Sequence, residues 1–143
     1  MLGAMRESEW YACAASFAGI SDLLAFSQHT RRLPDADIWT ERLGEDLRAL
    51  WQMSPIARVR SSETPLLLMH GLLDPLVPAS QSRRLARAAR KEGKTVELIL
   101  RSDCDHEMMI ESCRSAFYEQ LENFLQRHLG KNEVVADYAD ITQ

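Results

Sequence analysis

The stretch "TPLLLMHGLLDPLVPASQS", residues Thr64–Ser82, gives the clearest indication of the fold. It opens with an apolar run that ends in His-Gly, and such a run is typical of a strand buried on both faces of a parallel sheet. Asp74 follows among turn residues, and a helix is predicted to begin at about Ser80. The stretch therefore predicts a strand, then a turn that carries an acid, then a helix.

Two further segments have the same arrangement. "YACAASFAG", Tyr11–Gly19, is small and apolar, and Ser21-Asp22 can cap a helix that begins at Leu23. "TVELILR", Thr95–Arg101, is rich in β-branched and apolar residues and precedes a loop that contains a histidine. Residues 80–93 and 115–129 have the apolar spacing of amphipathic helices. The alternation predicts an α/β fold of about three parallel strands with covering helices.

Two side-chain patterns on the predicted helices have alternative interpretations. Four basic residues share one face near the second strand: Arg83, Arg87, Arg90 and Lys94. They form either a phosphate-binding patch or a solvated face, and the acidic total charge favours the solvated face. Four apolar residues recur at intervals of four: Trp39, Leu43, Leu47 and Trp51. They form either a ligand platform or, as the spacing favours, one face buried in the core.

Composition limits the class of protein. The 143 residues fit one domain, and a formal net charge of −4 gives no reason to expect nucleic acid as a partner. No apolar run approaches the length of a membrane-spanning helix, and the first residues do not form a secretory signal. Cys13, Cys104 and Cys113 have spacings that suggest neither a disulfide framework nor a zinc ribbon, so a reducing, cytoplasmic setting is expected.

An acid and a base follow neighbouring predicted strands. Asp74 comes three residues after the strand that ends at Gly71, and His106 comes five residues after Arg101. The carboxyl ends of parallel strands meet at one edge of a sheet, so the two loops are expected to lie side by side. A carboxylate there can accept the imidazole N–H and fix its tautomer, and the order Asp before His is that of α/β-hydrolases.

Other interpretations of these residues remain open. Asp74 can be only a turn residue, and His106 only the start of a helix. Cys104 is a less favoured nucleophile, because it lies in the loop that would present the base, and His29 and His128 are expected at the surface or at helix ends. A metal site is also conceivable, although contiguous residues rarely converge on one ion. Its ligands would come from Asp103, Cys104, Asp105, His106 and His70.

The sequence has no G-x-S-x-G motif for a nucleophilic serine. The nearest approach is "GISDL", Gly19–Leu23, which lacks the last glycine and is better explained as a helix cap. The acid and the base therefore have no serine partner within these residues.

From about Met1 to Leu129, the chain resembles the C-terminal part of the catalytic α/β-hydrolase domain of the prolyl oligopeptidase family of serine peptidases, in its acylaminoacyl-peptidase and dipeptidyl-peptidase branch. The resemblance rests on "YACAASFAGISDL", "MSPIARV", "TPLLLMHGLLDPLVPASQS" and the His106 corner followed by "FYEQLENFLQRHL". It implies that Asp74 is the triad acid and His106 the base. The loop "SDCDHEM" departs from the family, which usually has a glycine there.

The resemblance implies a partial hydrolase domain over residues 1–130 and a tail over residues 131–143, with the nucleophile, the oxyanion-hole loop and a propeller domain missing. We expect a serine peptidase fragment that needs no cofactor or metal and would hydrolyse peptides through an acyl-enzyme only within the full-length protein. An esterase fragment and a non-catalytic scaffold module are the alternatives. The strand at Tyr11–Gly19 would have an open edge, so a homo-oligomer is expected, with no nucleic-acid or membrane partner.

Overall fold

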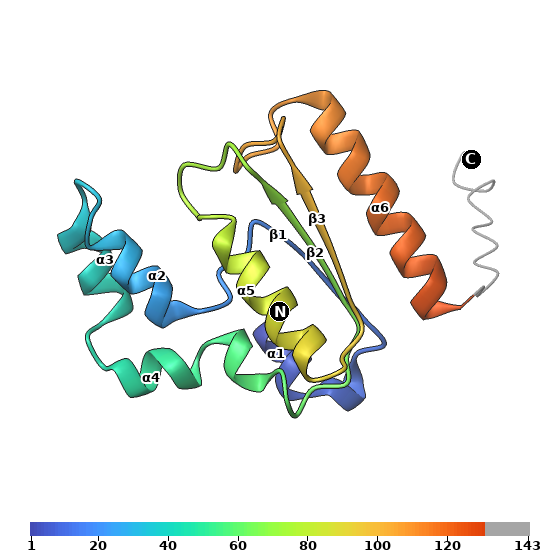
Figure 1. Ribbon diagram of the computed structural model, residues 1–143, viewed down its shortest axis with the longest axis horizontal. Helices are drawn as coiled ribbons and strands as arrows, with labels where there is room; N and C mark the ends of the chain where they lie inside the picture. Colours follow the sequence, from blue (N-terminus) through green and yellow to red (C-terminus); the bar gives the residue numbers. More distant parts are fainter. Residues whose placement is uncertain (131–143) are drawn as a thin grey trace, which may run out of the picture.

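The computed structural model describes residues 1–130, so the predicted tail over residues 131–143 lies outside the described residues. Helices, 3-10 turns and strands alternate along the chain (Figure 1). In order they are α1 (Leu2–Arg6), η1 (Ser8–Trp10), β1 (Ala14–Phe17), α2 (Leu23–Thr30), α3 (Ala36–Leu43), α4 (Leu47–Gln52), η2 (Pro55–Arg58), β2 (Leu66–Gly71), α5 (Ser80–Lys91), β3 (Val96–Arg101) and α6 (Glu111–Leu129).

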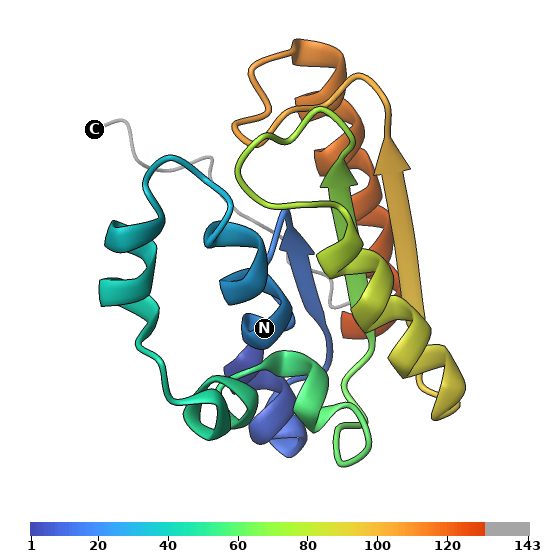
Figure 2. The ribbon, with the colours of Figure 1, turned by 60° about the vertical axis from the view of Figure 1, so that its left-hand side comes forward.

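The three strands form one parallel sheet in the order β1-β2-β3. Leu66 on the central strand is in register with Ala14 on one side and with Val96 on the other. All three strands point the same way, and the loops after β2 and β3 lie at the same end of the sheet (Figure 2). The predicted fold class, an α/β arrangement with about three parallel strands and covering helices, is confirmed.

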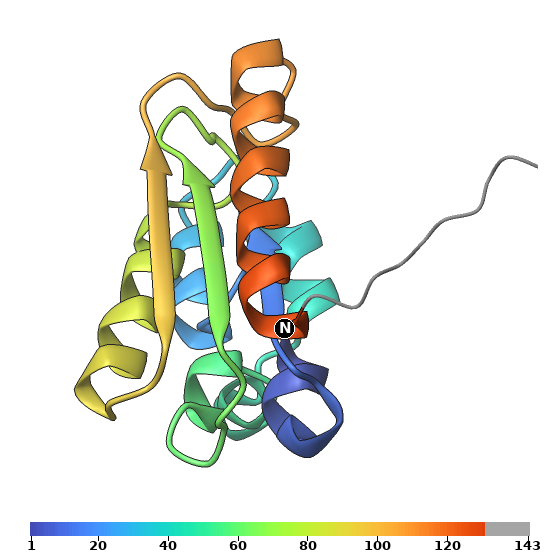
Figure 3. The same ribbon diagram turned by 90° about the vertical axis from the view of Figure 1, so that its right-hand side faces the viewer.

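Helices cover both faces of the central strand. Successive strand residues point to opposite faces, and both faces of β2 are covered by helices. All six residues of β2 are therefore buried, which explains why its sequence is a continuous apolar run. On one face, Leu66 and Leu68 pack into a core with Leu85 of α5 and Met5 of α1. On the other face runs α6 (Figure 3), whose Phe117 packs edge-on against Phe17 of β1 at 5.6 Å between ring centroids.

The structure corrects three expectations from the sequence. β1 is shorter than the predicted strand Tyr11–Gly19 because it is paired only where β2 lies beside it, from Ala14 to Phe17. The helix predicted over residues 115–129 begins earlier, at Glu111. The apolar residues of segment 39–51 do not share one buried face, because Gly44, at φ +74°, separates α3 from α4. As a result Leu47 is 60% exposed and Trp51 is 46% exposed.

Among the described helices, none is both long enough and apolar enough to cross a bilayer.

Candidate active site

The loops after β2 and β3 are joined by backbone hydrogen bonds before either reaches its functional side chain. The amide of Leu72 donates to the carbonyl of Arg101 at 2.8 Å, and the amide of Leu73 donates to the carbonyl of Cys104 at 3.0 Å. Gly71 lies at the closest approach, where an added Cβ would be 2.2 Å from the Cys104 carbonyl oxygen. The His-Gly at the end of β2 is therefore explained by this contact, since a larger residue would push the two loops apart.

The Asp74 carboxylate is wholly buried and fixed by its own turn. Its Oδ1 accepts hydrogen bonds from the amides of Leu76 and Val77, each at 2.9 Å, which is the geometry that makes aspartate favourable in such turns. Burial raises the pKa of the carboxyl, but hydrogen bonds from Val77, His106 and Leu76 outweigh burial and hold the pKa of Asp74 below its usual range. The residue is therefore an anion at neutral pH.

His106 faces this anion. Its Nδ1 lies 2.8 Å from Asp74 Oδ2, so Nδ1–H donates, and in the neutral imidazole Nε2 is then the acceptor. Among residues 1–130, none forms a hydrogen bond with His106 Nε2, and the side chain is 34% exposed. A hollow of about 260 Å³ beside the ring is lined by Pro75, Leu76, Asp105, His106 and Glu107. The ring is therefore oriented by a buried acid on one side and open to a reactant on the other.

His70 is a possible metal ligand from the sequence alone, but in the structure it supports the acid turn, residues Asp74–Val77. Its Nε2 lies 2.8 Å from the Val77 carbonyl, which can only accept, so Nε2 carries the proton. Its Nδ1 then accepts from the Ser82 hydroxyl at 2.8 Å. The same Nε2 lies 3.4 Å from Asp74 Oδ2. His70 therefore links the end of β2, the acid turn and the first turn of α5.

Gln81 joins the acid turn to the corner that follows β1. The side chain is buried, and its Oε1 accepts from the amides of Ser21 and Asp22 at 3.0 and 2.8 Å. Asp22 caps α2 as the sequence predicts, since its carboxylate accepts from the Ala25 amide. The Gln81-Ser82 pair at the start of α5 thus supports two neighbouring corners, through contacts to distant segments that local sequence does not indicate.

The spacing of the cysteines suggests no disulfide framework, but the structure contains one disulfide. Cys104 and Cys113 are bonded, and Cys13 is free. The spacing failed to indicate this bond because Cys113 belongs to the first turn of α6, which folds back over the loop. Since its sulfur is bonded, Cys104 is neither the thiolate ligand nor the nucleophile that the sequence left open. Within residues 1–130 no three His, Cys, Asp or Glu side chains gather as a metal site.

The remaining sequence candidates lie outside the pair. Asp103 binds the guanidinium of Arg101 through both carboxylate oxygens, and Asp105 accepts from the Met109 amide. His29 lies in α2 and His128 in the last turn of α6, where it packs against a phenylalanine, as their predicted helical positions suggested. Of the many candidates, the structure brings together Asp74, His106 and the supporting His70.

Comparisons with known proteins point to one family. Residues 1–132 match the model of the prolyl oligopeptidase family. The acylamino-acid-releasing enzyme of Homo sapiens is 30% identical over 91% of this chain and 15% of its own length. Esterase LipQ of Mycobacterium tuberculosis is 32% identical over 56% of this chain and 20% of its own length. The structure of a puromycin-hydrolyzing peptidase of Mycobacterium tuberculosis superposes with a TM-score of 0.80 and 26% identity, over 90% of this chain and 20% of that one. The chain therefore spans about a fifth or less of these relatives.

Proposed function

Because the chain belongs to the prolyl oligopeptidase family, we propose that it is the part of a serine peptidase that supplies the triad acid Asp74 and the triad base His106. The observation that carries the proposal is the 2.8 Å contact between a buried, ionised carboxylate and a histidine whose other nitrogen is accessible. Both side chains follow neighbouring parallel strands of an α/β-hydrolase sheet, where such sites form.

The chemistry follows from the geometry of the pair. His106 Nε2 takes the proton of a serine hydroxyl as the oxygen attacks the substrate carbonyl, and Asp74 stabilises the imidazolium that results. The same imidazolium then gives its proton to the leaving amine, and an acyl-enzyme remains. Water repeats the two steps and releases the acid. No G-x-S-x-G motif occurs within the 143 residues, so the proposal takes the serine from a part of the protein beyond them.

Short peptides are the proposed substrates. The human relative is named as an enzyme that releases acylamino acids, and the mycobacterial neighbour as one that hydrolyses puromycin. Both names describe the release or hydrolysis of amino-acid derivatives, and cleavage of an amide bond would use a base that protonates a leaving amine. The hollow beside His106 has an apolar wall formed by Pro75 and Leu76, suited to an uncharged side chain near the scissile bond.

Ester hydrolysis is the second candidate. It is favoured by the match to an enzyme named as an esterase, and the fold and the acid–base pair serve either acyl substrate. An alkoxide leaves more easily than an amine, so an esterase depends less on protonation of the leaving group by His106. For the 143-residue chain alone, the absence of the serine motif favours the third possibility from the sequence, a non-catalytic module.

The test uses the complete protein that contains this chain, with matched acyl-amide and acyl-ester substrates. We expect kcat for the amide to fall by about 10⁴-fold in Asp74→Asn and His106→Gln, because each variant removes one member of the triad. His128→Gln, far along α6, is the matched control and should keep kcat within about twofold. If the wild type turned over only the ester, the esterase function would be favoured. Undiminished turnover of both substrates in His106→Gln would refute the peptidase and the esterase alike.

The cytoplasmic location and the lack of a cofactor or membrane partner stay as proposals. The Cys104–Cys113 bond counts against a cytoplasmic location, because disulfides persist chiefly in oxidising compartments.

A further inference from the structure

The loop that carries His106 is closed by a disulfide. Cys104 lies two residues before the base, and Cys113 lies in the first turn of α6, with 5.5 Å between their Cα atoms. Both side chains are wholly buried. The bond therefore ties the segment that presents the base to the helix that covers the sheet.

Cys104 is also where this loop is attached to the acid side of the site. Its carbonyl accepts the Leu73 amide and lies against Gly71, directly before the turn that holds Asp74. One residue thus connects covalently to α6 and by a hydrogen bond to the loop after β2. Breaking the bond at the Cys104 sulfur would therefore disturb both the loop that carries His106 and the loop that carries Asp74.

The rest of the loop is held mainly by local contacts. The Asp105 carboxylate accepts from the Met109 amide, and the Arg114 guanidinium donates to the carbonyls of Met108 and Met109. Met108 has φ +53°, a conformation that residues other than glycine rarely adopt. Met109 is 67% exposed and Ile110 is 45% exposed, so packing contributes little to holding these two residues. Such a segment depends on its covalent closure to keep one conformation.

We propose that the Cys104–Cys113 bond is a redox control of the catalytic base. In the closed state it holds His106 against Asp74, and in the open state the loop moves and the contact is lost. Opening needs a dithiol reductant, which reaches the buried sulfurs when the exposed segment around Met109 and Ile110 opens locally. One thiolate then attacks a cysteine sulfur, the second displaces the mixed disulfide, and two protons pass to Cys104 and Cys113. The dithiol is oxidised to its disulfide by two electrons, and the protein disulfide is reduced by the same two.

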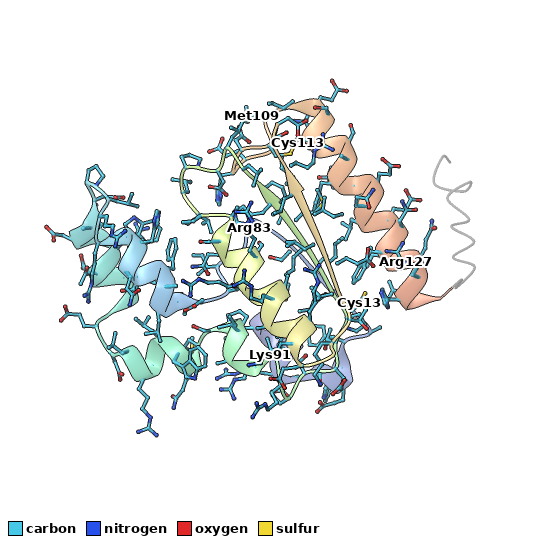
Figure 4. The ribbon with its side chains drawn as sticks, in the orientation of Figure 1. Cys13, Arg83, Lys91, Met109, Cys113 and Arg127 are labelled. Atoms are coloured by element: carbon cyan, nitrogen blue, oxygen red, sulfur yellow. A yellow bond between two sulfur atoms is a disulfide. The ribbon has the colours of Figure 1, made fainter. Side chains whose placement is uncertain are left out.

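Cys13 supplies a matched control. Figure 4 shows Cys13 and Cys113 near opposite ends of the sheet, so Cys13 is not an exchange partner of the pair within the folded chain. Burial raises the pKa of the Cys13 thiol, which makes it a poor nucleophile. The variant Cys13→Ser therefore removes the free thiol without touching the bond.

The effect on catalysis rests on the proposed function, but the movement of His106 does not, so the test observes the imidazole directly. The 143-residue chain carrying Cys13→Ser is labelled with ¹⁵N-histidine, and His106→Gln assigns the signal. In the oxidised chain we expect a His106 Nδ1–H resonance protected from solvent by Asp74. Dithiothreitol should raise its exchange rate by about tenfold or more, and reoxidation should restore it. In the double variant Cys104→Ser/Cys113→Ser, the His106 signal should exchange as fast as in the reduced chain, and dithiothreitol should not change its rate.

The amides of Leu67 and Leu68 in β2 report on the fold in the same spectra, and mass spectrometry reports the thiol count. The proposal is overturned if both cysteines are reduced while the His106 signal keeps its exchange rate, or if the air-oxidised chain contains free Cys104. It is also overturned if reduction exposes the β2 amides as well, because the bond would then stabilise the whole fold. None of these outcomes depends on peptidase activity, so failure of the proposed function is recognised separately by turnover of the complete protein.

Discussion

At the scale of single residues, the site is organised around one buried carboxylate. One oxygen of Asp74 accepts from amides of its own turn, and the other accepts from His106. His70 supports the turn through its hydrogen bond to the Val77 carbonyl. The negative charge tolerates burial because each oxygen accepts hydrogen bonds. The acid is therefore positioned by contacts formed before any substrate arrives.

Gly71 permits the approach of the two loops, which gives a prediction about stability. Gly71→Ala should lower the free energy of unfolding by about 1–3 kcal/mol, since its Cβ would overlap the backbone of Cys104. Urea denaturation followed by tryptophan fluorescence measures the change. Gly3→Ala is the control: its Cβ would meet only the Tyr11 hydroxyl at 3.8 Å, and within α1 it should stabilise by about 0.5–1 kcal/mol. Equal stability in Gly71→Ala would show that the loops are not in contact.

The lowered pKa of Asp74 predicts a dependence of stability on pH. The carboxyl has a lower pKa in the folded chain than its ordinary 3.8, so its stabilising contribution is present above that value and is lost as pH falls through the folded pKa. Asp74→Asn should remove this part of the acid destabilisation. Urea unfolding at several pH values measures it, with the exposed Asp37→Asn as control. Parallel pH profiles for wild type and Asp74→Asn would contradict the assigned contacts.

At the scale of elements, β1 is paired along one edge only within residues 1–130. The amide of Ala14 donates to the carbonyl of Pro65, just before β2, and the amide of Ala18 donates to that of Met69 in β2. The alternating amide of Ala15 therefore points to the open edge. Unpaired strand edges are templates for association with another chain. We propose that this edge, from the region Tyr11–Gly19, joins two copies of the chain.

Sedimentation of the isolated chain tests this proposal. The wild-type chain should sediment as a dimer or larger species, and Ala15→Pro should be monomeric, because proline removes the outward N–H and is tolerated on an edge strand. Ala15→Val keeps the N–H and should behave like wild type. A wild-type monomer at high concentration would exclude the edge as an interface.

At the scale of the whole molecule, much of the fold could be predicted from the sequence. The buried run of β2, the helix after Asp22 and the two loops with Asp74 and His106 all follow from local pattern and turn chemistry. Features that depend on distant segments could not be predicted. The pairing of Cys104 required α6 to fold back over the loop, and the hydrogen bonds of His70 required α5 to bring Ser82 beneath it.

The extent of the chain also gives a prediction. Because no G-x-S-x-G motif occurs in the 143 residues, the isolated chain should not react with a serine-directed fluorophosphonate probe. Intact mass after incubation measures the labelling, with a known serine hydrolase as the positive control. Stoichiometric labelling would mean that a serine within these residues is activated, and the division of the triad proposed above would be wrong.

We propose that Asp74 and His106 serve a serine elsewhere in the same protein. The most direct measurement is the coding sequence immediately upstream of the codon for Met1. We predict an open reading frame that continues upstream and encodes a G-x-S-x-G between a strand and a helix, as nucleophile elbows require. An in-frame stop codon with no such motif would contradict the claim, because the acid and the base would then have no nucleophile to activate.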